Sequence, residues 1–133
     1  YKIISIKVLP VRAFIESDEK NLGNISQRSI VAGKVKHFLT TMGWVIIDDK
    51  NQADFIVNIN ALTRQGVERH RVFTAFASGQ IAILRRDNEE EFLRRTINQL
   101  NGGGLTFTEA GEQALGKLAD AIIQELEIEF RRK

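Results

Sequence analysis

The stretch that most resembles a ligand-binding motif is rich in glycine and lies near the carboxyl end of the chain. Residues 111–117, GEQALGK, match most of the P-loop pattern G-x-x-x-x-G-K, and three further glycines stand at 102–104. A P-loop holds phosphate because its glycines precede a helix and because its last residue, serine or threonine, binds magnesium. Here Leu118 follows Lys117. The motif therefore lacks the residue that would bind the metal ion.

The glycines of this motif also fall inside an expected helix. Thr106 and Glu109 have the T-x-x-E spacing of a capping box, in which each side chain satisfies a free amide at a helix start. Apolar residues then recur on one helical face, namely Leu115, Leu118, Ala119, Ile122, Ile123, Leu126 and Phe130. We therefore expect Gly111 and Gly116 to let this helix approach a sheet closely, without a bound nucleotide.

The triple glycine at 102–104 leaves two interpretations open. Amides at the amino end of a helix attract anions, so these glycines could present backbone donors to a negatively charged ligand. Glu109, in the first turn of the expected helix, opposes an anion there. A flexible joint between a strand and the helix is the preferred interpretation.

Other side chains with catalytic potential lack the partners that chemistry requires. His37 and His70 are the only histidines, and neither belongs to a metal-binding pattern such as H-E-x-x-H. The acidic clusters at 48–54 and 89–91 flank expected turns, where carboxylates are usually solvated. The chain contains no cysteine. We therefore expect no catalytic residue, no cofactor and no metal ion, and predict a protein that is not an enzyme.

Basic residues near the ends of expected strands are the candidates for an interaction surface. Arginine suits protein interfaces and phosphate groups alike. The candidate protein-contact patch consists of Arg64, Arg69, Arg71, Arg94 and Arg95. Nucleic acid is not the favoured partner, because acidic residues interleave with the arginines and exposed aromatics for base stacking are lacking. For these residues taken alone, a solvated sheet edge of mixed charge is the preferred interpretation, ahead of a protein contact or a phosphate contact.

Composition and length indicate one globular domain spanning residues 1–133. The chain is 43% hydrophobic and 27% charged, with a formal net charge of +2, which is typical of an ordinary soluble fold. No apolar stretch approaches the roughly 18 residues of a transmembrane span. Because the chain begins at Tyr1 rather than at methionine, we expect it to be a fragment of a longer precursor.

The amino-terminal half predicts the order strand, helix, strand. Period-two alternation at 2–15 indicates a strand that Pro10 interrupts, and the polar stretch 17–24, SDEKNLGN, indicates a loop. Apolar residues at three- and four-residue spacing predict a helix over 26–42. Its start would be capped by Asn24 or Ser26 and its end by a left-handed Gly43. The apolar run 44–48, WVIID, predicts a buried strand.

The carboxyl-terminal half predicts an antiparallel hairpin followed by a less certain segment. After a turn at 49–54, residues 55–63 alternate as a half-buried strand, and the chain reverses around Gly66. Residues 71–85 return in alternation, with a bulge at Gly79. Residues 87–100 suit a helix or a strand, and we prefer a strand because the turn-forming residues 86–88 favour another reversal.

Together these elements predict an α+β fold, an α/β two-layer sandwich. A mixed sheet of four to five strands would carry two helices packed on one of its faces. In this arrangement the glycines at 111 and 116 would lie between the last helix and the sheet.

This order resembles a group of bacterial envelope domains. The group comprises the amino-terminal domain of TolB, the middle domain of flagellar assembly protein T, the penicillin-binding-protein activator lipoproteins and related small outer-membrane lipoproteins. The likeness rests on VAGKVKHFLTTMGWVIIDD (31–49), ADFIVNINAL (53–62), FASGQIAILRRDNEE (76–90) and GGGLTFTEAGEQALGKLADAI (102–122). It is a likeness of pattern, and it contains no catalytic motif.

The resemblance implies a non-enzymatic module that docks other envelope proteins. It also implies a location in the periplasm or at the periplasmic face of the outer membrane, reached through a leader missing from this chain. The chain departs from the lipoproteins by lacking a lipid-attachment cysteine. The alternative is a small nucleic-acid-binding α/β domain.

Overall fold

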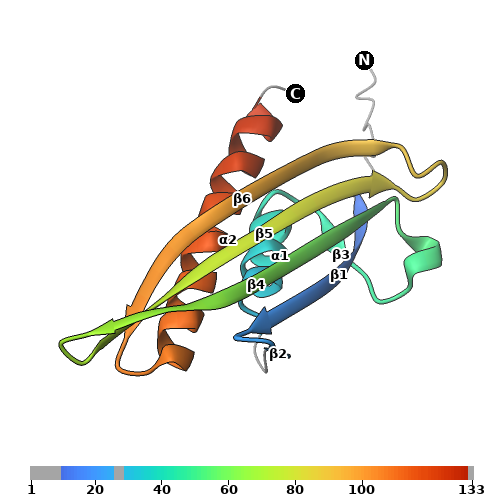
Figure 1. The fold of residues 1–133 in the computed structure, drawn as a ribbon. Helices are drawn as coiled ribbons and strands as arrows, with labels where there is room; N and C mark the ends of the chain where they lie inside the picture. Colours follow the sequence, from blue (N-terminus) through green and yellow to red (C-terminus); the bar gives the residue numbers. More distant parts are fainter. Residues whose placement is uncertain (1–9, 26–28, 132–133) are drawn as a thin grey trace, which may run out of the picture.

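The strands form one twisted mixed sheet, and both helices pack against the same face of it (Figure 1). The computed structural model describes residues 10–25 and 29–131. The strands are β1 (Arg12–Asn21), β2 (Asn24–Ile25), β3 (Val45–Ile46), β4 (Phe55–Arg69), β5 (Val72–Arg85) and β6 (Glu91–Gly104). The helices are α1 (Ile30–Thr41) and α2 (Phe107–Arg131), with a 3-10 turn η1 (Lys50–Gln52) between β3 and β4. The predicted two-layer sandwich is confirmed.

The sheet combines parallel and antiparallel pairs in the order β2-β1-β4-β5-β6. β1 is parallel to β4, with Ala13 opposite Phe55, whereas β4, β5 and β6 form an antiparallel meander. β3 lies parallel to the amino end of β1, and β2 lies antiparallel to its carboxyl end. The three long strands of the meander therefore form most of the sheet, and β1 pairs with the edge of β4 that β5 leaves free.

β1 is longer than the polarity of its residues indicates. The predicted loop at 17–24 is wrong for residues 17–21, which continue the strand beside β4. Their polar side chains are tolerated because one face of the strand is open and because Glu19 and Asn21 hydrogen-bond within the core layer. The turn is confined to Leu22 and Gly23, both with positive φ. The strand expected at 2–9 lies outside the described residues.

α1 buries the apolar stripe that predicted it and ends in a Schellman motif. The Trp44 amide donates to the Leu39 carbonyl at 3.0 Å, and the Gly43 amide donates to the Thr40 carbonyl at 3.0 Å. Gly43 has a φ of 92°, which confirms its predicted left-handed role. The helix begins after Ser29, so Asn24, which belongs to β2, does not cap it. Ser26 lies outside the described residues.

The segment 44–48 does not form the predicted buried strand. Only Val45 and Ile46 pair, and they do so at the sheet edge, where Val45 is 42% exposed. Trp44 instead stacks between Phe55 and Phe130, with ring centroids 5.4 and 5.6 Å away. The Trp44 ring therefore covers one end of the hydrophobic core.

The predicted hairpin of β4 and β5 is confirmed, but its turn is displaced. The chain reverses at His70 and Arg71, with φ values of 53° and 63°, rather than around Gly66. A register shift lies beside Gly79 in the pairing of β5 with β6, but the extra residue belongs to β6, where Gln99 has a φ of 57°, so the bulge expected at Gly79 lies on the opposite strand. The preference for a strand at 87–100 is also confirmed, because β6 occupies Glu91–Gly104.

α2 covers the meander with the apolar face that the sequence predicts. Leu115, Leu118, Ile122 and Leu126 are fully buried against residues of β4 and β5 such as Ile81. The hydrophobic core is therefore one layer, held between the sheet and the two helices.

Candidate interaction site

The amino end of α2 carries a capping box in place of a phosphate cradle. The Glu109 amide donates to the Thr106 hydroxyl at 3.1 Å, as the predicted capping box requires. In return the Glu109 carboxylate accepts the amide of Leu105 at 3.0 Å, one residue earlier than in the usual motif. An anion at this helix start would meet the Glu109 carboxylate.

The triple glycine is not a flexible joint, because it forms the end of β6 under the first turns of α2. Gly102 pairs with β5 opposite Ala75. A Cβ on Gly102 would stand 2.3 Å from the carbonyl oxygen of Ala110 and 2.4 Å from the amide nitrogen of Ala114. Glycine is needed there because the helix backbone lies directly on the strand.

Gly111 makes the predicted close approach between α2 and the sheet. A Cβ at this position would lie 1.8 Å from Oδ1 of Asn21. That amide oxygen accepts the Thr63 hydroxyl at 2.6 Å, while Nδ2 of Asn21 donates to the Thr108 carbonyl at 3.0 Å. The expectation for Gly116 is wrong, since the nearest atom to its added Cβ is a lysine ammonium of α1, at 3.9 Å.

The amino end of α1 is occupied as well, by a residue that the sequence analysis missed. Glu19, which is 6% exposed, accepts the amides of Val31 and Ala32 with its two carboxylate oxygens, at 2.9 and 3.1 Å. The carboxylate caps the helix from a neighbouring strand and matches the positive end of the helix dipole. Continuing the alternation of Ala13 and Ile15 through residue 19 would have placed this side chain on the helix face.

The acidic clusters serve local structure. Asp49 accepts the Asn51 amide in η1, and Asp54 accepts the main-chain amide of Arg12. Glu91 pairs with an arginine of β6. The two histidines lie apart, on α1 and in the β4–β5 turn. Across residues 10–25 and 29–131, no group of three histidine or acidic side chains could hold a metal ion.

The five arginines of the predicted patch do not lie together. Arg94 and Arg95 are neighbours in β6, so their side chains point to opposite faces of the sheet. Arg94 pairs with Glu91 on the open face, whereas Arg95 reaches Glu129 of α2 at 2.8 Å. Both are therefore held by ion pairs away from the remaining three.

Those three arginines lie along the outer part of the β4–β5 hairpin, with Arg69 and Arg71 at its turn and Arg64 farther back along β4. The guanidinium groups of Arg64, Arg69 and Arg71 are exposed and make no hydrogen bond or ion pair within the described chain. Val67 and Val72 of the same hairpin are 62% and 52% exposed. Exposed basic and apolar side chains thus lie along the same part of the hairpin.

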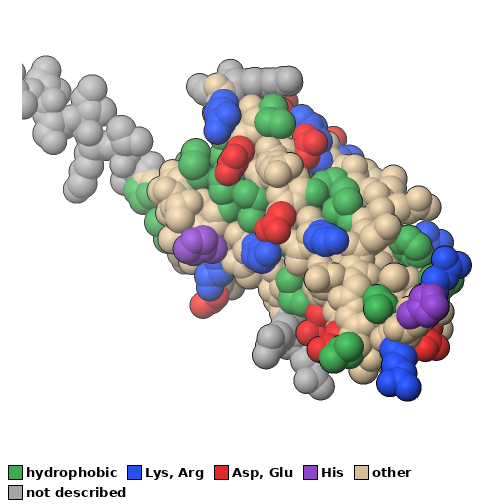
Figure 2. All heavy atoms as spheres, turned by 90° about the vertical axis from the view of Figure 1, so that its left-hand side faces the viewer, with side chains coloured by type: hydrophobic (Ala, Val, Ile, Leu, Met, Phe, Trp, Pro, Cys, Tyr) green, Lys and Arg blue, Asp and Glu red, His purple; other side chains and the backbone are tan. Residues whose placement is uncertain are grey.

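The connection between β6 and α2 lies at the same end of the molecule (Figure 1). It carries Leu105, which is 77% exposed, and Phe107, whose ring contacts Phe73 of β5 with a centroid distance of 4.7 Å. Figure 2 faces this end and shows basic and hydrophobic side chains side by side at its lower right. We call this surface the hairpin end; it consists of Arg64, Val67, Arg69, Arg71, Val72 and Leu105.

Comparisons with known proteins find similarity of structure only. No protein-family model and no curated protein sequence matches the chain. Protein XCC0632 from Xanthomonas campestris, of family DUF330, superposes with a TM-score of 0.60 at 9% identity, covering 93% of this chain and 87% of its own. A minor lipoprotein from Acinetobacter baumannii gives 0.57 at 11% identity, covering 95% and 96%. Lipoprotein GNA1162 from Neisseria meningitidis gives 0.54 at 10% identity, covering 89% and 99%.

At such low identity these likenesses show the fold and nothing of the activity. The resemblance to TolB and to flagellar assembly protein T stays a prediction. Within the described part of the chain, no helix has the length and apolarity that crossing a membrane requires.

Proposed function

We propose that this chain is a non-enzymatic, lipoprotein-like domain of the bacterial cell envelope that docks another envelope protein through its hairpin end. The location that accompanies this role is the periplasm or the periplasmic face of the outer membrane. The proposal rests on one observation, the exposed valines and leucine beside arginines that have no acidic partner in the described chain.

This combination of side chains is the usual composition of a protein interface. Arginine is enriched at protein interfaces, where its guanidinium group forms directed hydrogen bonds, and exposed apolar side chains contribute area that docking removes from water. The β4–β5 turn projects beyond the helix layer, so a partner can approach it from the open side (Figure 1). A partner carrying carboxylates around an apolar centre would satisfy both kinds of group.

Two further points support an adapter role. Several acidic residues with catalytic potential are engaged in helix caps and strand contacts, as in the case of Glu109 and Asp54. Two of the structural neighbours are described as lipoproteins, which by analogy of fold favours an envelope protein.

A photocrosslinking experiment tests the docking surface. A photoreactive phenylalanine analogue would replace Val67 in the chain expressed in the bacterial periplasm, and a matched control would carry it at Ile128 of α2, which is 47% exposed. We expect a discrete crosslinked protein from position 67 only, and its loss when Arg69→Glu and Arg71→Glu are added. Equal crosslinking from both positions, or none from position 67, would refute docking through the hairpin end.

Nucleic acid is the alternative partner, because the same three arginines suit phosphate groups. Titration with single-stranded and duplex nucleic acid across salt concentrations separates the two proposals. Protein docking predicts no binding at physiological salt. Micromolar binding that weakens steeply with salt and disappears in Arg69→Ala would instead favour the nucleic-acid function.

A further inference from the structure

The face of the sheet opposite the helices is hollowed along its middle. One hollow of about 290 Å³ is lined by residues that include Glu16, Asn58 and Gln80. A second, of about 330 Å³, runs on toward the hairpin and includes Thr96. The two share Asp18, Asn60 and Gln80, so they form one elongated depression, which we call the open-face groove.

The groove exists because short side chains form its floor. Ala82 lies in the first hollow, and Ser78 lies in the second. The strand register places longer side chains beside them on the same face, since Ala82 is opposite Asn58 of β4 and Arg94 of β6. Each hollow has a volume at the lower end of the usual range for ligand sites, which is about 300–1,000 Å³.

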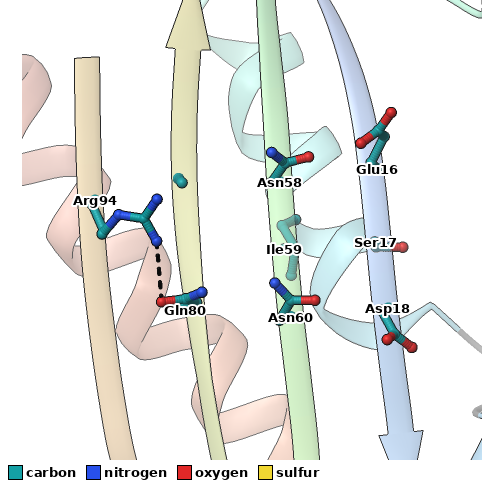
Figure 3. Close-up of a pocket in the computed structure, with 9 residues that line it drawn as sticks. Glu16, Ser17, Asp18, Asn58, Ile59, Asn60, Gln80 and Arg94 are labelled. Atoms are coloured by element: carbon teal, nitrogen blue, oxygen red, sulfur yellow. Dashed lines mark hydrogen bonds between the residues drawn. The ribbon is translucent and has the colours of Figure 1, made fainter. Parts of the chain in front are cut away.

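Polar groups line the groove without internal partners. Figure 3 shows Asn58 and Asn60 on β4 between the carboxylates of β1 and the Gln80 side chain of β5. Among the described residues, the side chains of Asp18, Asn58 and Asn60 form no hydrogen bond or ion pair. Oε1 of Gln80 accepts from Arg94 at 3.3 Å, which leaves its NH₂ group free to donate. The centre of the groove therefore offers donors and acceptors at adjacent positions.

The charges around the groove select against ionic ligands. Glu16 is neutralised by Lys50, at 2.7 Å, and Arg94 by Glu91. An anionic chain such as nucleic acid would meet the free carboxylate of Asp18, whereas a cation would meet the ammonium group of Lys20, which also lines the groove. The uncharged amides between them suit a neutral ligand that both donates and accepts hydrogen bonds, as hydroxyl groups do.

We propose that the open-face groove binds an uncharged oligosaccharide chain. The hydroxyls of successive sugar units would hydrogen-bond to the amides of Asn58, Asn60 and Gln80 and to the carboxylate of Asp18. The elongated shape, which follows the strands, favours a chain over a single small molecule. This site is separate from the hairpin end and does not depend on the docking proposal.

Side-chain amide signals in nuclear magnetic resonance spectra report directly on this site. The ¹⁵N-labelled chain would be titrated with maltohexaose, cellohexaose and chitohexaose as neutral probes. A heparin hexasaccharide serves as the anionic probe, and a glycine–serine peptide as the probe for peptide binding. We expect at least one neutral hexasaccharide to shift the NH₂ signals of Asn58, Asn60 and Gln80. The NH₂ signal of Asn101, which lies on the same face outside the groove, should not move.

Matched variants complete the test. Asn60→Ala should weaken binding of the neutral hexasaccharide about tenfold, the effect of losing one or two hydrogen bonds, whereas Asn101→Ala should leave it unchanged. Asp18→Asn, which keeps the shape of the groove, should weaken binding as well. The proposal is overturned if no neutral probe shifts these signals, if heparin or the peptide alone does so, or if Asn60→Ala binds as well as the parent chain.

Discussion

Substituting alanine for Gly111 tests the contact that joins α2 to the first strand. In a helix interior, alanine is favoured over glycine by about 1 kcal/mol, so propensity alone predicts a more stable protein. Against this, the new Cβ would lie 1.8 Å from Oδ1 of Asn21, which must move. Its displacement breaks the hydrogen bonds to Thr63 and Thr108 in a region where Asn21 is 9% and Thr63 4% exposed.

Each buried polar group left without a partner costs about 1–3 kcal/mol. Two such bonds outweigh the gain in helix propensity, so Gly111→Ala should lower the free energy of unfolding by about 1–5 kcal/mol. The matched control is Gly116→Ala, where the added Cβ has only a lysine ammonium, 3.9 Å away. There the propensity acts alone, and the free energy of unfolding should rise by up to about 1 kcal/mol.

Urea denaturation followed by circular dichroism measures both changes as shifts of the midpoint at constant slope. The Asn21→Ala background removes the clashing atom, so in that background Gly111→Ala should become neutral or stabilising. The reasoning fails if Gly111→Ala is equally destabilising in both backgrounds, or if the substitutions at 111 and 116 have the same effect.

Three further substitutions are tested by the same denaturation measurement. Glu19→Gln should lower the free energy of unfolding by about 1–3 kcal/mol, because the side-chain amide has only one oxygen to accept the two helix amides. The control is Ser29→Ala, which should change the free energy of unfolding little because the Ser29 side chain makes no capping bond. Equal effects of the two substitutions would contradict the cap assigned to Glu19. Gly102→Ala should prevent stable folding, because its Cβ would lie 2.3 Å from a helix carbonyl, while Gly103→Ala, with 3.7 Å of clearance, should fold normally. Thr106→Ala should cost about 0.5–2 kcal/mol through loss of the α2 cap, and an unchanged midpoint would exclude that role.

Periodicity predicted the parts of the fold in which side-chain burial decides the structure. The stripe from Leu115 to Leu126 and the alternation from Phe55 to Ala61 both lie on the core face. The capping box at 106–109 and the helix end at Gly43 were also predictable, because their chemistry is local.

The errors arose where a distant contact determines the local structure. The residues at 17–21 are polar, yet they form a strand because α1 and α2 supply hydrogen-bond partners for Glu19 and Asn21. The glycines at 102–104 suggest flexibility until α2 is placed on them. Neither partner can be identified from sequence spacing, since Asn21 and Thr108 are separated by 87 positions.

The candidate sites, like the fold, were predictable from the sequence only in part. The hairpin end contains Arg64, Arg69 and Arg71, which residue type alone had singled out, but Val67 and Leu105 emerged only from their exposure in the structure. The open-face groove was missed because its polar side chains come from three strands, with the amides on β4 and β5 and the carboxylates on β1. The alternating Asn58 and Asn60 in β4 were the one signal in the sequence, since they mark a polar face across a hydrophobic strand.

The parallel pairing of β1 with β4 also bears on the order of folding. β4, β5, β6 and α2 are successive neighbours that can associate through short loops, whereas β1 must close a long excursion, because Ala13 pairs with Phe55. We therefore expect the folding transition state to contain the β4–β5–β6 meander and α2, and β1 to pair with β4 after the transition state. Asn21→Ala should then accelerate unfolding and leave the refolding rate almost unchanged, as stopped-flow kinetics would show.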